Sequence, residues 1–130
     1  MKSEAYNTYV GSIMTRDVKT VDKETELVEA CKILDRHKIN SVVVTDENEV
    51  KGILTSSDIV SVVSNGENAE ESTVEDAMTE NVITLQTTDL VSHAADLILD
   101  NNIHHVPVID DNSVIGIVST SDVSAYLHVY

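Results

Sequence analysis

Two aspartates, each preceded by hydroxyl side chains, are the residues of this sequence best suited to bind a small ligand. The segments that they close read Gly52-Ile53-Leu54-Thr55-Ser56-Ser57-Asp58 and Gly116-Ile117-Val118-Ser119-Thr120-Ser121-Asp122. A carboxylate can accept charge-assisted hydrogen bonds from two adjacent hydroxyls, such as those of a ribose. An aspartate at the start of a helix can equally cap free backbone amides. Both interpretations are open for Asp58 and Asp122.

The hydroxyl side chains before these aspartates have the same two interpretations. They lie where a strand is expected to run into a helix, and hydroxyls beside free helix-start amides suit phosphate or ribose oxygens. Capping of the helix is their ordinary role. The residues concerned are Thr55, Ser57, Ser119 and Ser121.

Two adjacent histidines, His104 and His105, could contact an anion. A neutral imidazole donates one hydrogen bond, and a phosphate nearby favours its protonated form. His104 could equally be a partly buried residue without a ligand. Neighbouring residues of a strand point to opposite faces, so the pair does not predict a metal site.

The elements that must position these side chains occur twice. A shift of 64 residues aligns Val10 with Val74 and gives sixteen identities over 57 pairs without a gap, which indicates a duplicated unit. Apolar residues of both copies recur at i, i+3, i+4 and i+7, as on one face of a helix. They are Leu27, Ala30, Cys31 and Leu34, matched by Val91, Ala94, Ala95 and Ile98.

Each copy is predicted to fold as strand, helix, strand, strand, helix. The strands are expected at Val18–Val21, Ser41–Thr45 and Val50–Leu54, and in the second copy at Val82–Leu85, Val106–Ile109 and Val114–Val118. Turns are predicted at Asp46–Glu49 and Asp110–Ser113. Helix N-caps are predicted at Thr25 and Asp89, and the second helices near Ser57-Asp58 and Ser121-Asp122. We assign copy 1 to residues 10–66 and copy 2 to 74–130, with an extension at 1–9, a linker at 67–73 and a helix over residues 1–12.

The fold class is therefore α/β, more narrowly α+β, with two β-α-β-β-α motifs. One copy is too short to bury a core by itself, so the two are expected to pack as one pseudo-twofold module with a cleft per copy. At the position of the histidine pair the first copy carries Asn40 and Ser41, so Ser41 is its corresponding donor. Pro107 is the only proline and predicts an edge or strand-end position.

Composition excludes several classes of function. With 23 acidic and 8 basic residues, a formal net charge of −15 makes nucleic-acid binding improbable and opposes anionic ligands unless local donors compensate. The lone Cys31 cannot form an internal disulfide and falls on an apolar helix face, which predicts a small buried residue. No apolar run approaches the ~20 residues that span a bilayer. We expect a cytoplasmic protein with no membrane contact.

The sequence also lacks the motifs of common enzymes. It contains no glycine-rich phosphate loop, no Gly-x-Ser-x-Gly elbow and no His-Glu-x-x-His. We therefore expect no catalytic activity, no catalytic cofactor and no resident metal.

The paired motifs resemble those of the CBS domain family. The openings Val10–Val18 and Val74–Val82, the two closing segments and the strand Ile103–Asp110 are similar to the family's motifs. The resemblance covers the chain from about Val10 to Tyr130. It implies a regulatory module, a stand-alone CBS pair, that binds AMP, ADP, ATP or S-adenosylmethionine in clefts between the motifs and signals to a partner protein.

The resemblance also implies roles for individual residues. The closing aspartates would bind ribose, and His105 or Ser41 would contact phosphate. Backbone groups near Thr20 and Thr84, with Val106 and Pro107, would hold the adenine. Because the second copy alone carries histidines, the two clefts are expected to differ.

A second hypothesis is a ligand-free module that only dimerises or docks on a partner protein. A symmetric homodimer is expected under either hypothesis. The apolar residues expected to form its contact are Ile59, Val63, Val123 and Leu127.

Overall fold

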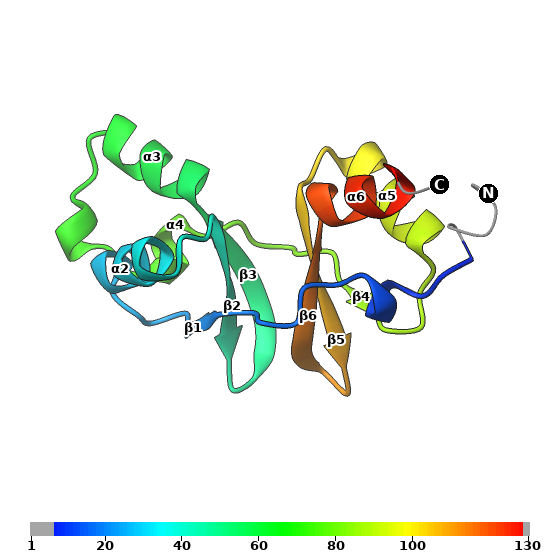
Figure 1. The fold of residues 1–130 in the computed structure, drawn as a ribbon. Coiled ribbons are helices and arrows are strands. Elements are labelled where there is room, and N and C mark those ends of the chain that lie inside the picture. The colour runs from blue at the N-terminus through cyan, green and yellow to red at the C-terminus, as the bar shows by residue number, and fades with distance from the viewer. Residues whose placement is uncertain (1–6, 129–130) are drawn as a thin grey trace. The chain divides into compact units, whose positions relative to one another are not determined.

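The computed structural model describes residues 7–128 and divides them into two compact units (Figure 1). One spans Lys19–Val82 (the Asp58 unit), and the other combines residues 7–18 with residues 83–128 (the Asp122 unit). The units therefore differ from the sequence repeats. Each repeat contributes its opening segment to one unit and the rest of its length to the other.

Both units contain the same series of strand, helix, strand, strand and helix, together with short helical segments from the opening segment and, in the Asp58 unit, from the linker. The Asp58 unit consists of β1 (Thr20–Asp22), α2 (Leu27–His37), β2 (Ser41–Asp46), β3 (Glu49–Thr55), α3 (Ser56–Ser64), η2 (Ala69–Glu71) and α4 (Val74–Ala77). The Asp122 unit consists of η1 (Val10–Ser12), β4 (Leu85–Gln86), α5 (Val91–Asn101), β5 (His105–Asp110), β6 (Ser113–Ser119) and α6 (Thr120–His128). The order strand, helix, strand, strand, helix that the sequence predicts is confirmed.

Each unit has one three-stranded sheet, and the two sheets have the same topology. Their orders are β1-β2-β3 and β4-β5-β6. The first two strands pair in parallel, and the last two form an antiparallel hairpin. Two consecutive turn residues have positive φ, Glu47 and Asn48 in one hairpin and Asp111 and Asn112 in the other. Such turns match the right-handed twist of the strands, so the predicted turns are confirmed.

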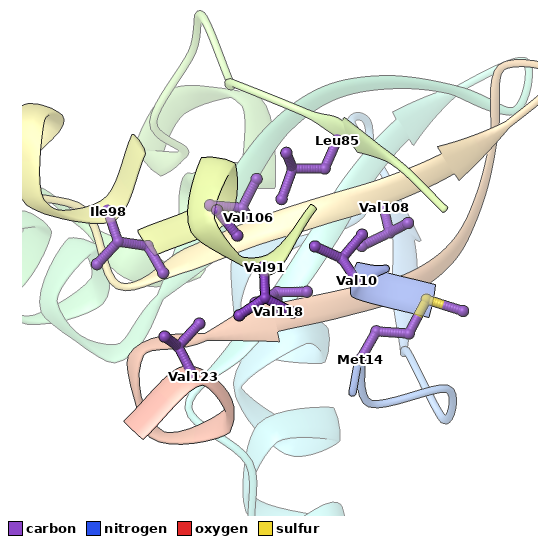
Figure 2. Packing of buried hydrophobic residues seen from close by; sticks show 10 residues of the cluster. Val10, Met14, Leu85, Val91, Ile98, Val106, Val108, Val118 and Val123 are labelled. Atoms are coloured by element: carbon purple, nitrogen blue, oxygen red, sulfur yellow. The ribbon is translucent and has the colours of Figure 1, made fainter. Parts of the chain in front are cut away.

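The opening segment of each repeat is built into the core of the unit that it joins. Val10 and Met14 are 0% and 7% exposed among the core residues of the Asp122 unit (Figure 2). Val74 is fully buried at the corresponding place in the Asp58 unit. The strands supply much of the remaining core, including Val42, Val44 and Leu54 in one unit and Val106, Val108 and Val118 in the other. The predicted helix stripe supplies the rest, since Leu27, Ala30, Leu34, Val91, Ala94 and Ile98 are buried.

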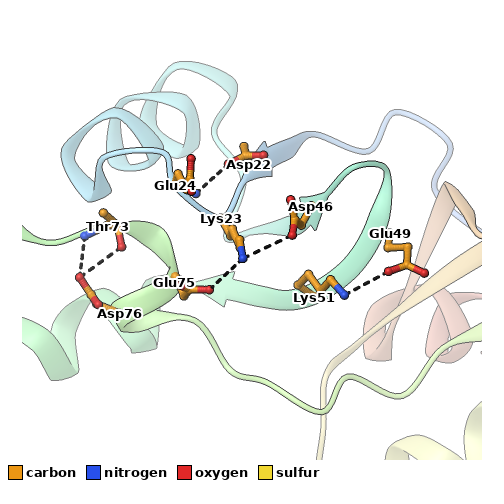
Figure 3. Close-up of polar contacts among 9 residues, drawn as sticks. All are labelled: Asp22, Lys23, Glu24, Asp46, Glu49, Lys51, Thr73, Glu75 and Asp76. Atoms are coloured by element: carbon orange, nitrogen blue, oxygen red, sulfur yellow. Dashed lines mark hydrogen bonds and ion pairs between the residues drawn. The ribbon is translucent and has the colours of Figure 1, made fainter.

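Ion pairs also hold the opening segment of the Asp58 unit against its sheet. The Nζ atom of Lys23 lies 3.3 Å from a carboxylate oxygen of Asp46, at the end of β2, and 3.6 Å from one of Glu75, in α4 (Figure 3). Thr73 and Asp76 form a capping box at the start of α4. In the Asp122 unit Thr87 and Gly11 occupy the positions of Lys23 and Glu75, so only the backbone bond from Gly11 N to Thr87 O, at 3.1 Å, is retained.

Several predicted boundaries are wrong. Glu26 and Leu90, not Thr25 and Asp89, occupy the N-cap positions of α2 and α5, and neither caps with its side chain. The Asp89 carboxylate instead accepts a 2.7 Å hydrogen bond from the amide of Gln86, in the turn before the helix. That turn competes for the side chain, which is why an aspartate beside the helix start does not cap it.

The helix expected over residues 1–12 is also wrong as far as the structure describes that segment. The only helical turn there is η1, from Val10 to Ser12, and residues 1–6 lie outside the described residues. The second helices begin at Ser56 and Thr120, directly after their strands.

The edge or strand-end position predicted for Pro107 is wrong, because this residue lies within β5, the middle strand of its sheet. The neighbouring parallel strand explains how a proline is tolerated there. In the Asp58 unit the corresponding Val43 donates its amide to Lys19 O at 3.1 Å, and β1 begins at Thr20. Proline has no amide hydrogen to donate. The strand β4 begins one repeat position later, at Leu85, so that Thr84 precedes the strand instead of opening it.

Candidate functional site

The junction between β3 and α3 places the Asp58 carboxylate through a capping box. Thr55 is the N-cap residue, and its hydroxyl accepts a hydrogen bond from the Asp58 amide at 3.3 Å. The Oδ2 atom of Asp58 in turn accepts from the Thr55 amide at 2.9 Å. The capping role therefore belongs to Thr55, and Asp58 is its partner at the third helical position. This arrangement fixes the position of the carboxylate and leaves its Oδ1 atom out of the capping box.

The same arrangement recurs between β6 and α6. The Oδ2 atom of Asp122 accepts from the Ser119 amide at 2.9 Å, and the Asp122 amide donates to the Ser119 hydroxyl at 3.2 Å. The hydroxyl oxygens of Ser119 and Ser121 lie 2.9 Å apart. Asp58 and Asp122 are both half-buried, so their carboxylates are positioned by the fold and still accessible.

A threonine from the opening segment of the other repeat contacts each of these carboxylates. Thr79 donates from its hydroxyl to Asp58 Oδ1 at 3.2 Å. Thr15 donates to the Asp122 carboxylate at 3.3 and 3.4 Å from its two oxygens. Sequence reasoning did not assign a site role to either threonine. The available signal was the Met-Thr pair that is identical in both repeats.

Paired backbone bonds hold each threonine in place. Thr79 exchanges bonds with Ile53 at 2.9 and 3.1 Å, and Thr15 does so with Ile117 at 2.8 and 2.9 Å. This close approach depends on a glycine in each hairpin. A Cβ atom on Gly52 would lie 2.7 Å from both Met78 Sδ and the carbonyl oxygen of Thr79. The glycine of the closing segment therefore lets the opening segment reach the aspartate.

The donors predicted on the central strands lie beside these junctions. Ser41 pairs with Thr55 across the β2–β3 hairpin, and His105 pairs with Ser119 across β5–β6. The Nδ1 atom of the exposed His104 lies 3.3 Å from the Thr120 hydroxyl. The structure thus brings Ser41, Thr55 and Asp58 together in one unit, and His105, Ser119, Ser121 and Asp122 together in the other.

The other predicted site residues lie farther along the strands or at the surface. Ser57 is exposed on the first turn of α3, and Thr20 is exposed at the start of β1. The side chain of Val106 is fully buried in the core cluster of its unit, so only its backbone could meet a ligand. Pro107 is buried too, and strand geometry directs it to the opposite face of β5.

His105 is the titratable side chain of the site with a shifted pKa. Desolvation of the half-buried imidazole lowers its pKa below the ordinary value, and the charge of His104 lowers it further. The negative charge of Asp122 acts in the opposite direction, and burial outweighs it. The imidazole is therefore mostly neutral near pH 7, able to donate one hydrogen bond and accept another.

Side chains next to the contacting threonines carry opposite charges in the two units. Arg16 follows Thr15 and is exposed, with a guanidinium nitrogen that donates to the Gly11 carbonyl at 3.1 Å. Glu80 follows Thr79 and is exposed as well. None of the ion pairs recorded among residues 7–128 involves Asp58 or Asp122.

A hollow of about 540 Å³ lies between α2 and α3 of the Asp58 unit, with Asn40 and Ser56, the neighbours of Ser41 and Thr55, in its lining. Cys31, Ile39 and Val60 are among its lining residues, and none of the predicted ligand-binding residues lines it. Cys31 packs against the core from the helix stripe but is half-buried and not buried as predicted, and burial raises the pKa of its thiol.

Within residues 7–128 there is no cluster of three or more histidine, cysteine, aspartate or glutamate side chains placed to hold a metal ion. No helix in the described part of the chain is long and apolar enough to cross a bilayer.

Comparison with known proteins identifies a family and a ligand-bound relative. The CBS domain family model matches residues 10–65 and 74–129. A solved structure of the CBS domain pair of protein MJ0100, in complex with 5′-methylthioadenosine and S-adenosyl-L-methionine, superposes with a TM-score of 0.84 at 36% identity. The match covers 93% of this chain and 96% of that one.

Two curated relatives are longer than the matched region. The chain is 38% identical to an uncharacterized protein of Methanopyrus kandleri, over 88% of this chain and 60% of the relative. It is 37% identical to the L-aspartate semialdehyde sulfurtransferase of Methanocaldococcus jannaschii, over 90% of this chain and 23% of the relative. The chain therefore corresponds to only part of each of these proteins.

Proposed function

The chain belongs to the CBS domain family, and we propose that it is a regulatory module whose Asp58 and Asp122 carboxylates each bind the ribose of an adenosine-containing ligand. The ligands proposed are AMP, ADP, ATP or S-adenosylmethionine. The complex of the MJ0100 pair with two adenosyl compounds supports this choice.

The observation that carries the proposal is the bond between each aspartate and its threonine. Both bonds are long for a hydroxyl donor, at 3.2 Å in one unit and 3.3 and 3.4 Å in the other. A ribose offers two adjacent hydroxyls to the same carboxylate, and charge-assisted hydrogen bonds are stronger than neutral ones. Ribose can therefore replace a weak contact, while the capping bonds to Oδ2 keep the carboxylate in position.

The remaining predicted residues complete the proposed sites. Ser41 or His105 faces the phosphate or the corresponding substituent of the ligand, with the hydroxyls of the helix start nearby. Backbone groups around Thr20 and Thr84 hold the adenine. Val106 and Pro107 shape the adenine pocket from β5, Val106 through its backbone because its side chain is in the core.

A binding screen tests the proposal. Calorimetry and thermal unfolding would be measured with adenosine, 5′-methylthioadenosine, S-adenosylmethionine, AMP and ATP, with guanosine as the matched control. A ligand at about 100 times its Kd should add about 2.7 kcal/mol to the free energy of unfolding. If every adenosyl compound behaves like guanosine, the proposal is wrong, and a ligand-free docking module becomes the better interpretation.

An exposed apolar surface on α3 supports a homodimer and a signalling role. Val60 and Val63 on α3 are each 62% exposed, an apolar surface that a second copy or a partner protein could cover. Val123, however, is only 7% exposed in the core, so its predicted place in the contact is wrong. The side chain of Leu127 lies outside the described residues. A monomeric mass by light scattering at micromolar concentration would contradict the dimer.

The proposed role is regulation of a partner protein in the cytoplasm, without catalysis by this module. Relatives named as enzymes contain a CBS region as about a quarter of their length. That proportion is consistent with a regulatory region beside a separate catalytic part.

A further inference from the structure

The two candidate sites have nearly the same backbone and different charges. Around Asp122 the fold places Arg16, His104 and His105, and at the corresponding positions around Asp58 it places Glu80, Asn40 and Ser41. The two sites therefore differ at all three positions. The Asp122 site has one cation and two imidazoles, and the Asp58 site has one anion and two neutral side chains.

The exchange of opening segments determines which charge meets which aspartate. In the sequence, Arg16 belongs to the same repeat as Asp58, and Glu80 to the same repeat as Asp122. In the structure the pairing is reversed, because Thr15 contacts Asp122 and Thr79 contacts Asp58. Each charged residue directly follows its threonine, and consecutive Cα atoms lie about 3.8 Å apart. The Cα atoms of Arg16 and Glu80 therefore lie within about 10 Å of the carboxylate that the preceding threonine contacts, and the Debye length at 0.1 M salt is also about 10 Å.

Such charges decide between ligands because the protein as a whole repels anions. Its formal net charge is −15, so a phosphate is disfavoured wherever no local positive group or donor compensates. Around Asp122, Arg16 and the imidazole donors offset that background. Around Asp58, Glu80 adds a second carboxylate to the site, which repels a phosphate further and attracts a sulfonium or ammonium group.

We propose that the two sites select adenosyl ligands by charge: the Asp122 site binds phosphate-bearing ligands such as AMP, and the Asp58 site binds uncharged or cationic ones such as 5′-methylthioadenosine or S-adenosylmethionine. This inference rests on the proposed function, because it assigns ligand classes to the same sites. One module would then report two different adenosyl compounds at once.

Site-resolved calorimetry tests the assignment. The Asp58→Asn and Asp122→Asn variants each leave one intact site, on which AMP, 5′-methylthioadenosine and S-adenosylmethionine are compared. The intact Asp122 site should bind AMP more tightly than S-adenosylmethionine, and the intact Asp58 site should show the reverse order. A rise in salt should narrow both differences, because it screens the charges that cause them.

Charge reversal identifies the responsible residues. Glu80→Arg should strengthen AMP binding at the Asp58 site by about three- to tenfold, and Arg16→Glu should weaken it at the Asp122 site by a similar factor. Binding of the uncharged 5′-methylthioadenosine should stay constant in both variants. Matched controls are Glu29→Arg and Arg36→Glu, which change the net charge equally at exposed positions of α2. The neutral variants Glu80→Gln and Arg16→Gln should give about half of each effect on a logarithmic scale.

The outcomes separate the two proposals. Equal preference of both sites for AMP, or an equal effect of the α2 controls, would overturn the charge assignment while leaving adenosyl binding intact. Absence of binding by all three compounds at both sites would overturn the proposed function and this inference with it.

Discussion

The Asp58 and Asp122 units share a hydrogen-bonded framework and differ in the side chains that surround it. The bond from the opening segment to the residue before the N-cap of the first helix, for example, measures 2.8 Å in both, from Val74 N to Thr25 O and from Val10 N to Asp89 O. The capping bonds and the paired bonds of Thr15 and Thr79 also recur. Backbone geometry has therefore been kept while the chemistry next to each aspartate has changed, which is how one framework can hold two sites of different selectivity.

The largest expected difference between the units concerns their hairpin glycines. An added Cβ would meet a methionine sulfur at either position, Met78 at 2.7 Å from Gly52 and Met14 at 2.5 Å from Gly116, but the nearest backbone carbonyl lies at 2.7 Å for Gly52 and at 3.1 Å for Gly116. Gly52→Ala should therefore lower the free energy of unfolding by about 3 kcal/mol, and Gly116→Ala by about 1 kcal/mol. Urea unfolding of the two variants measures this directly. Equal losses would mean that Met14 is as rigid as the Thr79 backbone.

Removal of each carboxylate that we propose to bind ribose should weaken binding of a different ligand in each unit. Asp122→Ala should weaken AMP binding by about 1–3 kcal/mol, because a charge-assisted acceptor is lost. Asp58→Ala should do the same for 5′-methylthioadenosine. Calorimetry gives both affinities, and circular dichroism confirms that the variants are folded, since each also loses a capping-box bond. An unchanged Kd in a folded variant would reduce that aspartate to a structural role.

A smaller difference should appear in how the free energy of unfolding depends on pH, because only the Asp122 unit has a half-buried histidine, His105, where the Asp58 unit has Ser41. The pKa of His105 is lowered in the folded protein, with His104 and Asp122 as the charged groups that act on it. As pH falls below about 6.5, the unfolded chain binds a proton that folded His105 does not yet bind. Stability should therefore fall over that range, until the pH reaches the lowered pKa.

The matched variant is His105→Ser, which installs the residue that the other repeat carries at position 41. Its stability should be less sensitive to pH between about 6.5 and 5 than that of the parent protein. Urea midpoints at several pH values give the comparison, and the other histidines cancel in the difference. Parallel profiles for both proteins would show that His105 titrates normally.

The smallest expected effect belongs to Lys23, which has no counterpart in the Asp122 unit. The hydrogen bond to Asp46 and its charge raise the pKa of Lys23, with Glu75 adding to the effect. Lys23→Met should lower the urea midpoint slightly in low salt, because exposed ion pairs contribute little and salt screens them. Lys51→Met, which removes a pair within β3, is the control. A decrease in the urea midpoint that persists in 1 M salt would show that the aliphatic part of Lys23 stabilises the protein by packing instead.

The repeat made the elements of this fold predictable, because each pattern was seen twice. The helix stripe, the hairpin turns and the strand order followed from periodicity and turn residues. The errors arose where two local interactions compete, as at Asp89, whose carboxylate bonds to a turn amide instead of capping the helix. The position of Pro107 was predicted wrongly because a proline is tolerated in β5 only where the neighbouring strand β4 is short. The residues around Pro107 carry no information about the length of β4.

The candidate site was predictable only in part for a different reason. Asp58, Asp122 and their hydroxyl neighbours lie within one closing segment, so their proximity could be predicted from sequence. The contacts of Thr15 and Thr79 join segments far apart along the chain. Spacing carries no information about them, and neither repeat shows that its opening segment packs with the other. The selectivity that we propose depends on that exchange.

The discontinuity of the Asp122 unit also bears on the order in which the protein folds. Its threonine–aspartate contact joins residues 107 positions apart, against 21 positions in the Asp58 unit. Closing the longer loop costs about 1.4 kcal/mol more in chain entropy. During synthesis, Lys19–Val82 is complete before β6 exists, so this unit can fold first. Residues 7–18 can pack into the Asp122 unit only after β6, the last strand, has been synthesised. Pulse-labelling hydrogen exchange should therefore protect Ile53 before Ile117.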